Sequence, residues 1–256
     1  MLIYVFIFIV GAAIGSFLNV CIYRLPRQES IVFPGYHCTQ CNHRIYWHDN
    51  IPLLSFILLG GKCRFCARRI SFRYFTVELL TALAFLTMHL FFGFSARFFV
   101  FSVLSSALIA VTFIDFEHQI IPDVITIPGI ILGIMASLLF PSVQGQVSRL
   151  ISFVDSSVGV FAGGGSIYAM GVFGRMLFKK EAMGGGDVKL MAMIGAFLGW
   201  RLVIFVFFIA PFFGSTAGIF EKIVHKKDII PYGPYISMAT IIGMLWGERL
   251  LGYLFF

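Results

Sequence analysis

The sequence predicts an all-α polytopic membrane protein with about eight transmembrane helices and one small soluble insert between the first two. Of the 256 residues, 59% are hydrophobic and 12% are charged, whereas a soluble domain has about 25% charged residues. A helix crosses a hydrocarbon core about 30 Å thick with about 20 mostly apolar residues. Eight segments fit this requirement, the sixth being the shortest: 2–22, 76–92, 98–114, 122–140, 156–177, 188–200, 202–220 and 233–253.

The first segment, MLIYVFIFIVGAAIGSFLNVC, is expected to remain as a helix. It has small residues where a signal peptidase could cut, but the basic residues that begin a secretory signal are absent. Its positive charges follow at Arg24 and Arg27, so the positive-inside rule places the N-terminus in the periplasm and residues 23–75 in the cytoplasm. Residues 1–22 are therefore the first transmembrane helix, 23–75 a cytoplasmic Cys-rich insert and 76–256 a transmembrane core.

The basic residues support this topology. Only four of them fall outside when eight helices are threaded from this start: Arg97, Arg149, Arg201 and Arg249. The formal net charge of +7 is thus mainly a topology signal, and nucleic acid is not an expected partner. The basic inner face suits the anionic headgroups of membrane lipids.

Two Cys-x-x-Cys motifs in the insert predict a metal site. Cys38 and Cys41 form the first pair, and Cys63 and Cys66 form the second. Four thiolates with this spacing suit a structural Zn²⁺ ion, and a metal would stabilise a segment of about 50 residues whose core is small. A reducing cytoplasm argues against structural disulfides. Two redox pairs or unrelated buried thiols are the alternative.

Two aspartates are expected at the same depth on the cytoplasmic side of the membrane. Asp115 ends the third apolar segment and Asp187 opens the sixth. Facing carboxylates can share a proton, so that one deprotonates a water molecule while the other polarises a scissile carbonyl. Gly184, Gly185 and Gly186 could then seat an extended substrate beside Asp187, because a backbone without Cβ atoms allows close approach. The alternative is a flexible loop in which Asp187 only caps the following helix.

The other acidic residues near the apolar segments have simpler interpretations. Asp123 follows Pro122 at the start of a segment and is expected to cap that helix, with a catalytic role as the alternative. Glu78 is either a carboxylate at a helix start or a polar contact near the active site. Glu248 lies beside Arg249 and is expected in a surface ion pair.

Motifs along nearly the whole chain resemble those of the bacterial prepilin peptidases, or type IV leader peptidases, which are GxGD intramembrane aspartyl proteases. The matching stretches, in the order of that family, are GSFLNVCIYRLP at 15–26, CTQC, NIPLLS at 50–55, CRFC, RYFTVELLTA at 73–82, IDFEHQIIPD with Asp115 and Asp123, GGGD at 184–187 and PYGPY at 231–235. GxGD alone would be a weak signal, whereas the ordered set is specific.

The resemblance implies a multi-pass enzyme of the cell inner membrane, with its active site at the cytoplasmic face. It would cleave the leader of type IV prepilins and type II secretion pseudopilins after a glycine, then N-methylate the new N-terminus with S-adenosyl-L-methionine. Asp115 and Asp187 would be the catalytic pair. The four cysteines would be the zinc ligands, and their presence favours the bifunctional form. The sequence contains no fingerprint of soluble methyltransferases, so no contacts to the methyl donor are assigned.

The helix ends suggest which aspartate is ionised. Asp187 begins a helix, where the positive end of the helix dipole favours an anion, and Asp115 ends one, where the dipole disfavours it. Lys189 is expected to add to the effect on Asp187. We therefore expect Asp187 to activate water and Asp115 to be protonated.

Three alternative functions remain open for the protein as a whole. They are a monofunctional leader peptidase, an ion-coupled transporter and a membrane scaffold.

Overall fold

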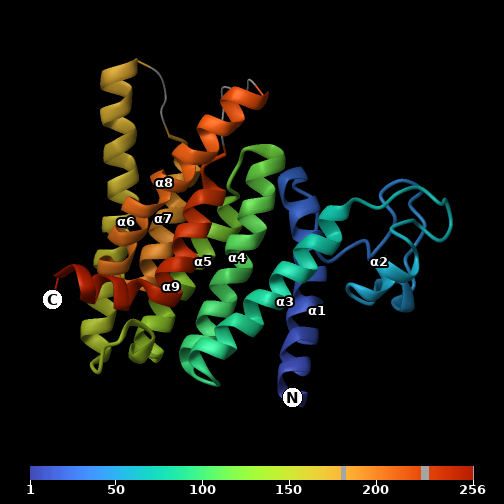
Figure 1. Cartoon of the computed structure of the whole chain (residues 1–256), viewed down its shortest axis with the longest axis horizontal. Coiled ribbons are helices and arrows are strands. Elements are labelled where there is room, and N and C mark those ends of the chain that lie inside the picture. Colours follow the sequence, from blue (N-terminus) through green and yellow to red (C-terminus); the bar gives the residue numbers. More distant parts are fainter. Residues whose placement is uncertain (180–182, 226–230, 256) are drawn as a thin grey trace. The chain divides into compact units, whose positions relative to one another are not determined.

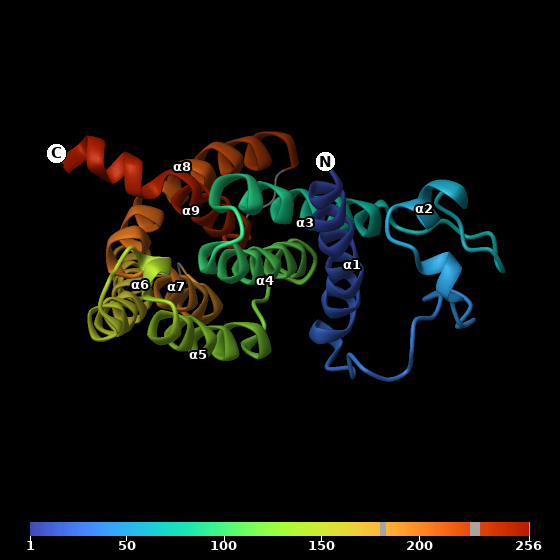
Figure 2. The ribbon, with the colours of Figure 1, turned by 90° about the horizontal axis from the view of Figure 1, so that it is seen from below.

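The chain is built from helices joined mostly by short turns (Figures 1 and 2). The computed structural model describes residues 1–179, 183–225 and 231–255. Within them, β pairing consists of two isolated bridges, His37 with Arg44 and Lys62 with Arg69. The chain divides into two compact units, Met1–Gly93 and Phe94–Phe256, and each is described by itself.

The first unit is a pair of long helices with the Cys-rich insert between them. Its elements are α1 (Leu2–Arg24), η1 (Leu25–Arg27), η2 (Trp47–Asn50), α2 (Leu54–Leu58) and α3 (Phe72–Phe92). Helices α1 and α3 pack closely because small residues of α1 face α3. A Cβ atom on Gly15 would lie 2.7 Å from the Cα atom of Glu78. Nearer the insert, the Asn19 amide donates to the Tyr74 carbonyl at 3.0 Å.

The second unit is a bundle around one short helix. Its elements are α4 (Ala96–His118), α5 (Asp123–Leu139), η3 (Pro141–Gln144), α6 (Arg149–Phe178), α7 (Gly185–Leu198), α8 (Trp200–His225) and α9 (Gly233–Phe255). Helix α7 packs against α4, α5, α6, α8 and α9, and every residue from Leu190 to Leu198 is buried. Figure 2 shows α7 beside α5 and α6.

The closest helix pair in this unit is α6 with α7. Gly159 of α6 and Gly195 of α7 each lie against the backbone carbonyl of the other, so neither position has room for a Cβ atom. The Ser156 hydroxyl also donates to the Ala196 carbonyl at 2.7 Å. These contacts fix the position of α7 along α6 and its rotation about its own axis. They also fix the residues at the N-terminal end of α7.

Each of the eight apolar segments expected from the sequence falls on a helix of the described chain, and the structure confirms a helical membrane protein. By length and composition, four described helices can cross a membrane: Leu2–Arg27, Phe72–Phe92, Ala96–His118 and Arg149–Leu177. Asp123–Leu139 and Trp200–Thr216 are apolar but shorter. With 14 residues, α7 is about 21 Å long, less than the roughly 30 Å of a hydrocarbon core.

Candidate active site and metal centre

Asp115 is held near the end of α4 by a backbone group from a distant part of the chain. The residue is 5% exposed, and its Oδ2 atom accepts the Gly233 N–H at 2.8 Å. A Cβ atom at Gly233 would itself lie 2.8 Å from Oδ2, so the position accepts only glycine without a shift. Gly233 is a partner of Asp115 that could not be assigned from the sequence alone. The motif PYGPY around it was the available signal.

Asp187, the third residue of α7, both caps its helix and interacts with Asp115. Its Oδ2 atom accepts the Gly184 N–H at 3.3 Å, and its own N–H donates to the Gly184 carbonyl at 3.1 Å. The capping alternative is therefore confirmed as a contact. Helices α4 and α7 pack against each other, and the charge of Asp115 acts on the Asp187 carboxyl group, so the two candidate carboxylates lie near one another. A catalytic role for the pair stays a prediction.

Tyr232 adds a third polar group to this place. Its ring precedes Gly233 and interacts electrostatically with Asp187. Its buried hydroxyl has no hydrogen-bond partner among the residues that the structure describes. The segment before α9 therefore contributes a backbone donor and a phenol to the surroundings of the aspartate pair.

The three glycines before Asp187 have different surroundings. Gly184 supplies the N–H that Asp187 accepts. Gly186 packs on the turn between α4 and α5, where a Cβ atom would lie 2.9 Å from the Cβ atom of Ile121. Around Gly185, no atom of the residues that the structure describes lies within 4 Å of a Cβ position. Of the three glycines, Gly185 is therefore the one with free space at its Cβ position, whereas Gly184 and Gly186 make contacts within the protein.

Lys189 and Asp123 form an ion pair, which corrects two sequence expectations. The Lys189 ammonium lies 2.7 Å from both carboxylate oxygens of Asp123. Asp123 is the first residue of α5 and makes no capping hydrogen bond, because Pro122 is at the N-cap position. The expected cap was therefore wrong. The expectation that Lys189 acts on Asp187 was also wrong, because its ammonium is bound by Asp123.

Two other acidic residues are used in structural contacts. Glu78 is buried in the first unit, and its carboxylate accepts the Leu53 N–H of the insert at 2.8 Å. It therefore anchors the insert on α3. Glu248 is in a surface ion pair as expected, but its partner is Arg97, at 2.9 Å, and not its neighbour Arg249.

The four cysteines of the insert come together in one cluster. The sulfur atoms of Cys38, Cys41, Cys63 and Cys66 all lie within 4.8 Å of one another. Four thiols at this separation are a donor set that fits a tetrahedral Zn²⁺ ion. The backbone N–H groups of Cys66 and Phe65 point at the Cys63 sulfur and lower the pKa of that thiol to about 7, whereas the pKa of the neighbouring Cys41 thiol is raised to about 11.

The two Cys-x-x-Cys turns repeat one local structure. The backbone carbonyl of Cys38 accepts the Asn42 N–H at 2.8 Å, and the backbone carbonyl of Cys63 accepts the Ala67 N–H at 2.9 Å. Asn42 and Ala67 both have a φ of 55°. Asparagine tolerates this left-handed conformation better than alanine does, so the second turn holds a strained residue in place.

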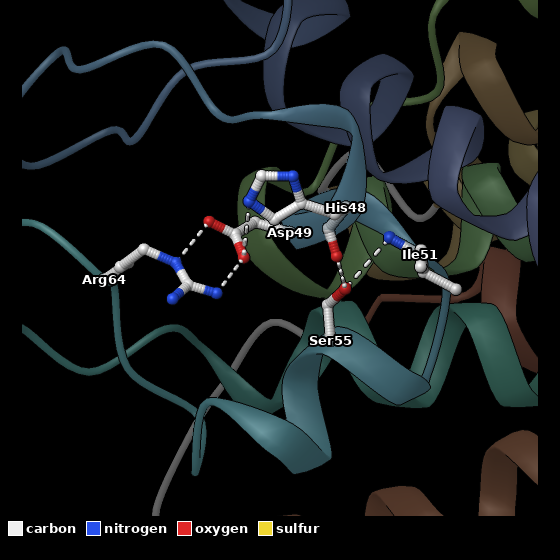
Figure 3. Close-up of polar contacts among 5 residues, drawn as sticks. All are labelled: His48, Asp49, Ile51, Ser55 and Arg64. Carbon is white, nitrogen blue, oxygen red and sulfur yellow. Dashed lines mark hydrogen bonds and ion pairs between the residues drawn. The ribbon is translucent and has the colours of Figure 1, made fainter.

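The second Cys-x-x-Cys turn is tied to the middle of the insert by an arginine–carboxylate pair (Figure 3). Arg64 donates to both oxygens of Asp49, from Nε at 2.8 Å and from Nη2 at 2.6 Å. The Ser55 hydroxyl accepts the Ile51 N–H and donates to the His48 carbonyl, which fixes η2 on α2. The Asp49 side chain is only 6% exposed. Arg64 lowers the pKa of this carboxyl group.

The fold and the site together define a class of helical membrane protein, with two aspartates near helix ends and a four-cysteine cluster in a small insert. Within this class, the chain belongs to the type IV leader peptidase family. The family model described as Type IV leader peptidase family matches residues 102–219. The model described as Bacterial Peptidase A24 N-terminal domain matches residues 9–92.

Curated relatives agree with this assignment. A prepilin leader peptidase/N-methyltransferase of Myxococcus xanthus is 41% identical over 84% of this chain, which spans 62% of that protein. Proteins with the same description from Aeromonas hydrophila and Pseudomonas aeruginosa are 34% and 32% identical, over 95% and 94% of this chain and 91% and 90% of their own lengths. No solved structure matches the chain.

Proposed function

We propose that the chain removes the leader peptide of type IV prepilins and type II secretion pseudopilins, and then N-methylates the new N-terminus. The observation that carries the proposal is that, in a chain of the type IV leader peptidase family, Asp115 lies near the end of α4 and Asp187 lies in the first turn of α7, a helix that packs against α4. The curated relatives named above are described as both peptidases and methyltransferases, which supports the second activity.

In the proposed mechanism the aspartates divide the acid and base roles. Ionised Asp187 takes a proton from a water molecule, and the resulting hydroxide adds to the carbonyl carbon of the scissile bond. Protonated Asp115 donates its proton to the carbonyl oxygen. The tetrahedral intermediate then breaks its C–N bond as a proton passes to the leaving amine. Since the Gly233 N–H binds Oδ2 of Asp115, we place the donated proton on Oδ1.

The glycines before Asp187 are proposed to seat the substrate. Gly184, Gly185 and Gly186 place a strip of backbone without side chains next to the pair. Gly185 is the member whose surroundings are open, so we assign the closest backbone approach to it. An extended leader segment there would bring its scissile peptide bond alongside Asp187.

Zinc and S-adenosyl-L-methionine complete the proposal. Cys38, Cys41, Cys63 and Cys66 would hold a structural Zn²⁺ ion, which would supply folding free energy to the insert. S-adenosyl-L-methionine is the second substrate: its S–CH₃ bond breaks as the N–CH₃ bond forms on the new N-terminal amine. The residues that bind it are not assigned.

The proposed location is the cell inner membrane, crossed eight times, with the N-terminus in the periplasm. This places residues 23–75, Asp115 and Asp187 at the cytoplasmic face. The short helix α7 would count as one of the crossings although it is enclosed by protein. The domain division expected from the sequence, with the peptidase core in residues 76–256, is kept as a proposal, although residues 76–93 belong to the first compact unit of the structure.

The test is an assay of the purified protein in detergent with a prepilin peptide and labelled S-adenosyl-L-methionine. A shortened and labelled product is expected. Cleavage without label would leave a monofunctional peptidase, and an intact peptide would favour a transporter or a scaffold.

Asparagine variants test the catalytic pair in the same assay. Asp115→Asn and Asp187→Asn should each lower kcat by at least about 100-fold, since each removes a group that transfers a proton. Residual cleavage should be greater in Asp115→Asn, because asparagine imitates a neutral acid. Greater activity in Asp187→Asn would reverse the roles, and a wild-type rate in either variant would show that the pair is wrong.

A further inference from the structure

We propose that the ion pair between Asp123 and Lys189 positions Asp187 opposite Asp115, and that this pair is needed for the rate of cleavage more than for the stability of the fold. The inference rests on the proposed function of the two aspartates. It gives Asp123 and Lys189 a role as positioning residues, because neither contacts the aspartate pair itself in the described structure.

The pair connects the two segments that carry the aspartates. Lys189 is two residues beyond Asp187 in α7, and Asp123 follows Asp115 by eight residues across the turn between α4 and α5. The Lys189 ammonium lies 2.7 Å from both Asp123 oxygens. A contact at this place restrains the first turn of α7 directly against the chain that leaves Asp115.

A second contact lies on the other side of Asp187. Gly186 packs against Ile121, with no space for a Cβ atom between them. Residues 186 and 189 of α7 thus meet residues 121 and 123 of the turn and the start of α5. Two contacts that bracket Asp187 fix its position along the turn and its rotation about the α7 axis, which one contact could not do.

The exposure of the pair separates its effect on rate from its effect on stability. The side chains of Lys189 and Asp123 are 44% and 53% exposed, and exposed ion pairs contribute little to the free energy of unfolding. A displacement of about 1 Å in a catalytic group can nevertheless lower a rate about 100-fold. Loss of the pair should therefore change kcat far more than thermal stability.

The experiment is a double-mutant cycle with Asp123→Asn, Lys189→Met and the two combined. Each single variant should lower kcat for a prepilin peptide by about 10- to 100-fold with KM within about threefold of wild type. The double variant should be no slower than the worse single variant, because both changes remove the same contact. If the kcat losses of the two single variants multiply in the double variant, the two residues act independently and the proposed positioning role of the pair is wrong. A change confined to KM would also overturn it, in favour of direct contacts with the substrate.

A matched control comes from another ion pair of this unit, Arg97 with Glu248 at 2.9 Å. Glu248→Gln removes an exposed pair of the same kind that involves neither α5 nor α7. It should leave kcat unchanged, and an equal loss of kcat in this control would show that the effect is general destabilisation.

A readout without cleavage keeps the inference separate from the proposed function. Hydrogen exchange of the backbone amides from Gly184 to Lys189 should be faster in Asp123→Asn and in Lys189→Met than in wild type, and unchanged in Glu248→Gln. If wild-type protein cleaved no prepilin but exchange responded in this way, the proposed function would fail and the contact would stand. Unchanged exchange in both pair variants would overturn the positioning role.

Discussion

At the scale of single residues, Asp187 shows why a carboxylate follows three glycines at this place. The Gly184 N–H binds its side chain, and the positive end of the α7 dipole favours its anion. The same two features make a good helix cap and a good general base. The cap and the proposed catalytic role are therefore compatible, because the contact that caps the helix also orients the carboxylate.

Gly185 and Gly186 give a matched pair of variants that separates substrate seating from packing. Gly186→Ala should lower the free energy of unfolding by about 1–3 kcal/mol, because the new methyl group meets Ile121. Gly185→Ala should leave stability within about 0.5 kcal/mol, since its surroundings are open, but should raise KM for a prepilin peptide several-fold. Thermal unfolding and steady-state kinetics measure the two effects. An unchanged KM in Gly185→Ala would show that the substrate does not pack against Gly185.

The contacts between residues far apart in the sequence are the part of the site that could not be predicted. The positions of Asp115 and Asp187 near helix ends followed from hydropathy, and the spacing of the cysteines indicated their cluster. The partners of Asp115 and Lys189 did not follow, since Gly233 is 118 residues from Asp115 and Asp123 is 66 from Lys189. Such contacts depend on how helices pack, which a periodicity along one helix does not encode.

At the scale of elements, the pair between Asp49 and Arg64 supports the second Cys-x-x-Cys turn. Arg64 lowers the pKa of Asp49, whose unperturbed value is about 4. The stabilisation is therefore present above that pH and is lost only as the pH falls through the lower folded pKa.

Asp49→Asn tests this support in the metal-loaded full chain. The variant should speed hydrogen exchange of residues 47–66 a few-fold, and by the same factor at pH 5.5 and pH 8, because Asp49 remains ionised between them. An effect that shrinks toward pH 5.5 would show that the carboxylate titrates in that range. Gln40, whose side chain accepts a bond from Arg68 at 3.1 Å, gives a matched uncharged control as Gln40→Ala.

The helices themselves were predictable because each apolar segment is long enough to be recognised by composition. All eight expected segments lie on helices, with ends that differ by a few residues. The central place of α7 was not predictable. Its residues are as apolar as those of a helix that faces lipid, since hydropathy does not distinguish burial against lipid from burial against protein. The shortness of the segment at 188–200 was the available hint.

At the scale of the whole molecule, the compact units of the structure and the matches to the two family models divide the chain at nearly the same place. The two compact units are Met1–Gly93 and Phe94–Phe256, and the two family models cover residues 9–92 and 102–219. All four cysteines of the cluster lie in the first unit, and both aspartates lie in the second. Folding of the metal site and chemistry at the aspartate pair are thus assigned to different units.

Removal of one cysteine tests whether the metal serves folding or cleavage. Cys38→Ser should make residues 23–75 sensitive to protease while residues of the second unit remain resistant, because a small insert depends on its metal for stability. Since no cysteine of the cluster lies in the second unit, kcat for cleavage should stay within about threefold of wild type, a difference in barrier of less than about 1 kcal/mol. Cys21→Ser is the control, because Cys21 is a buried thiol of α1 outside the cluster. A resistant insert in Cys38→Ser would count against a structural metal, and a large loss of kcat would show that the insert takes part in cleavage.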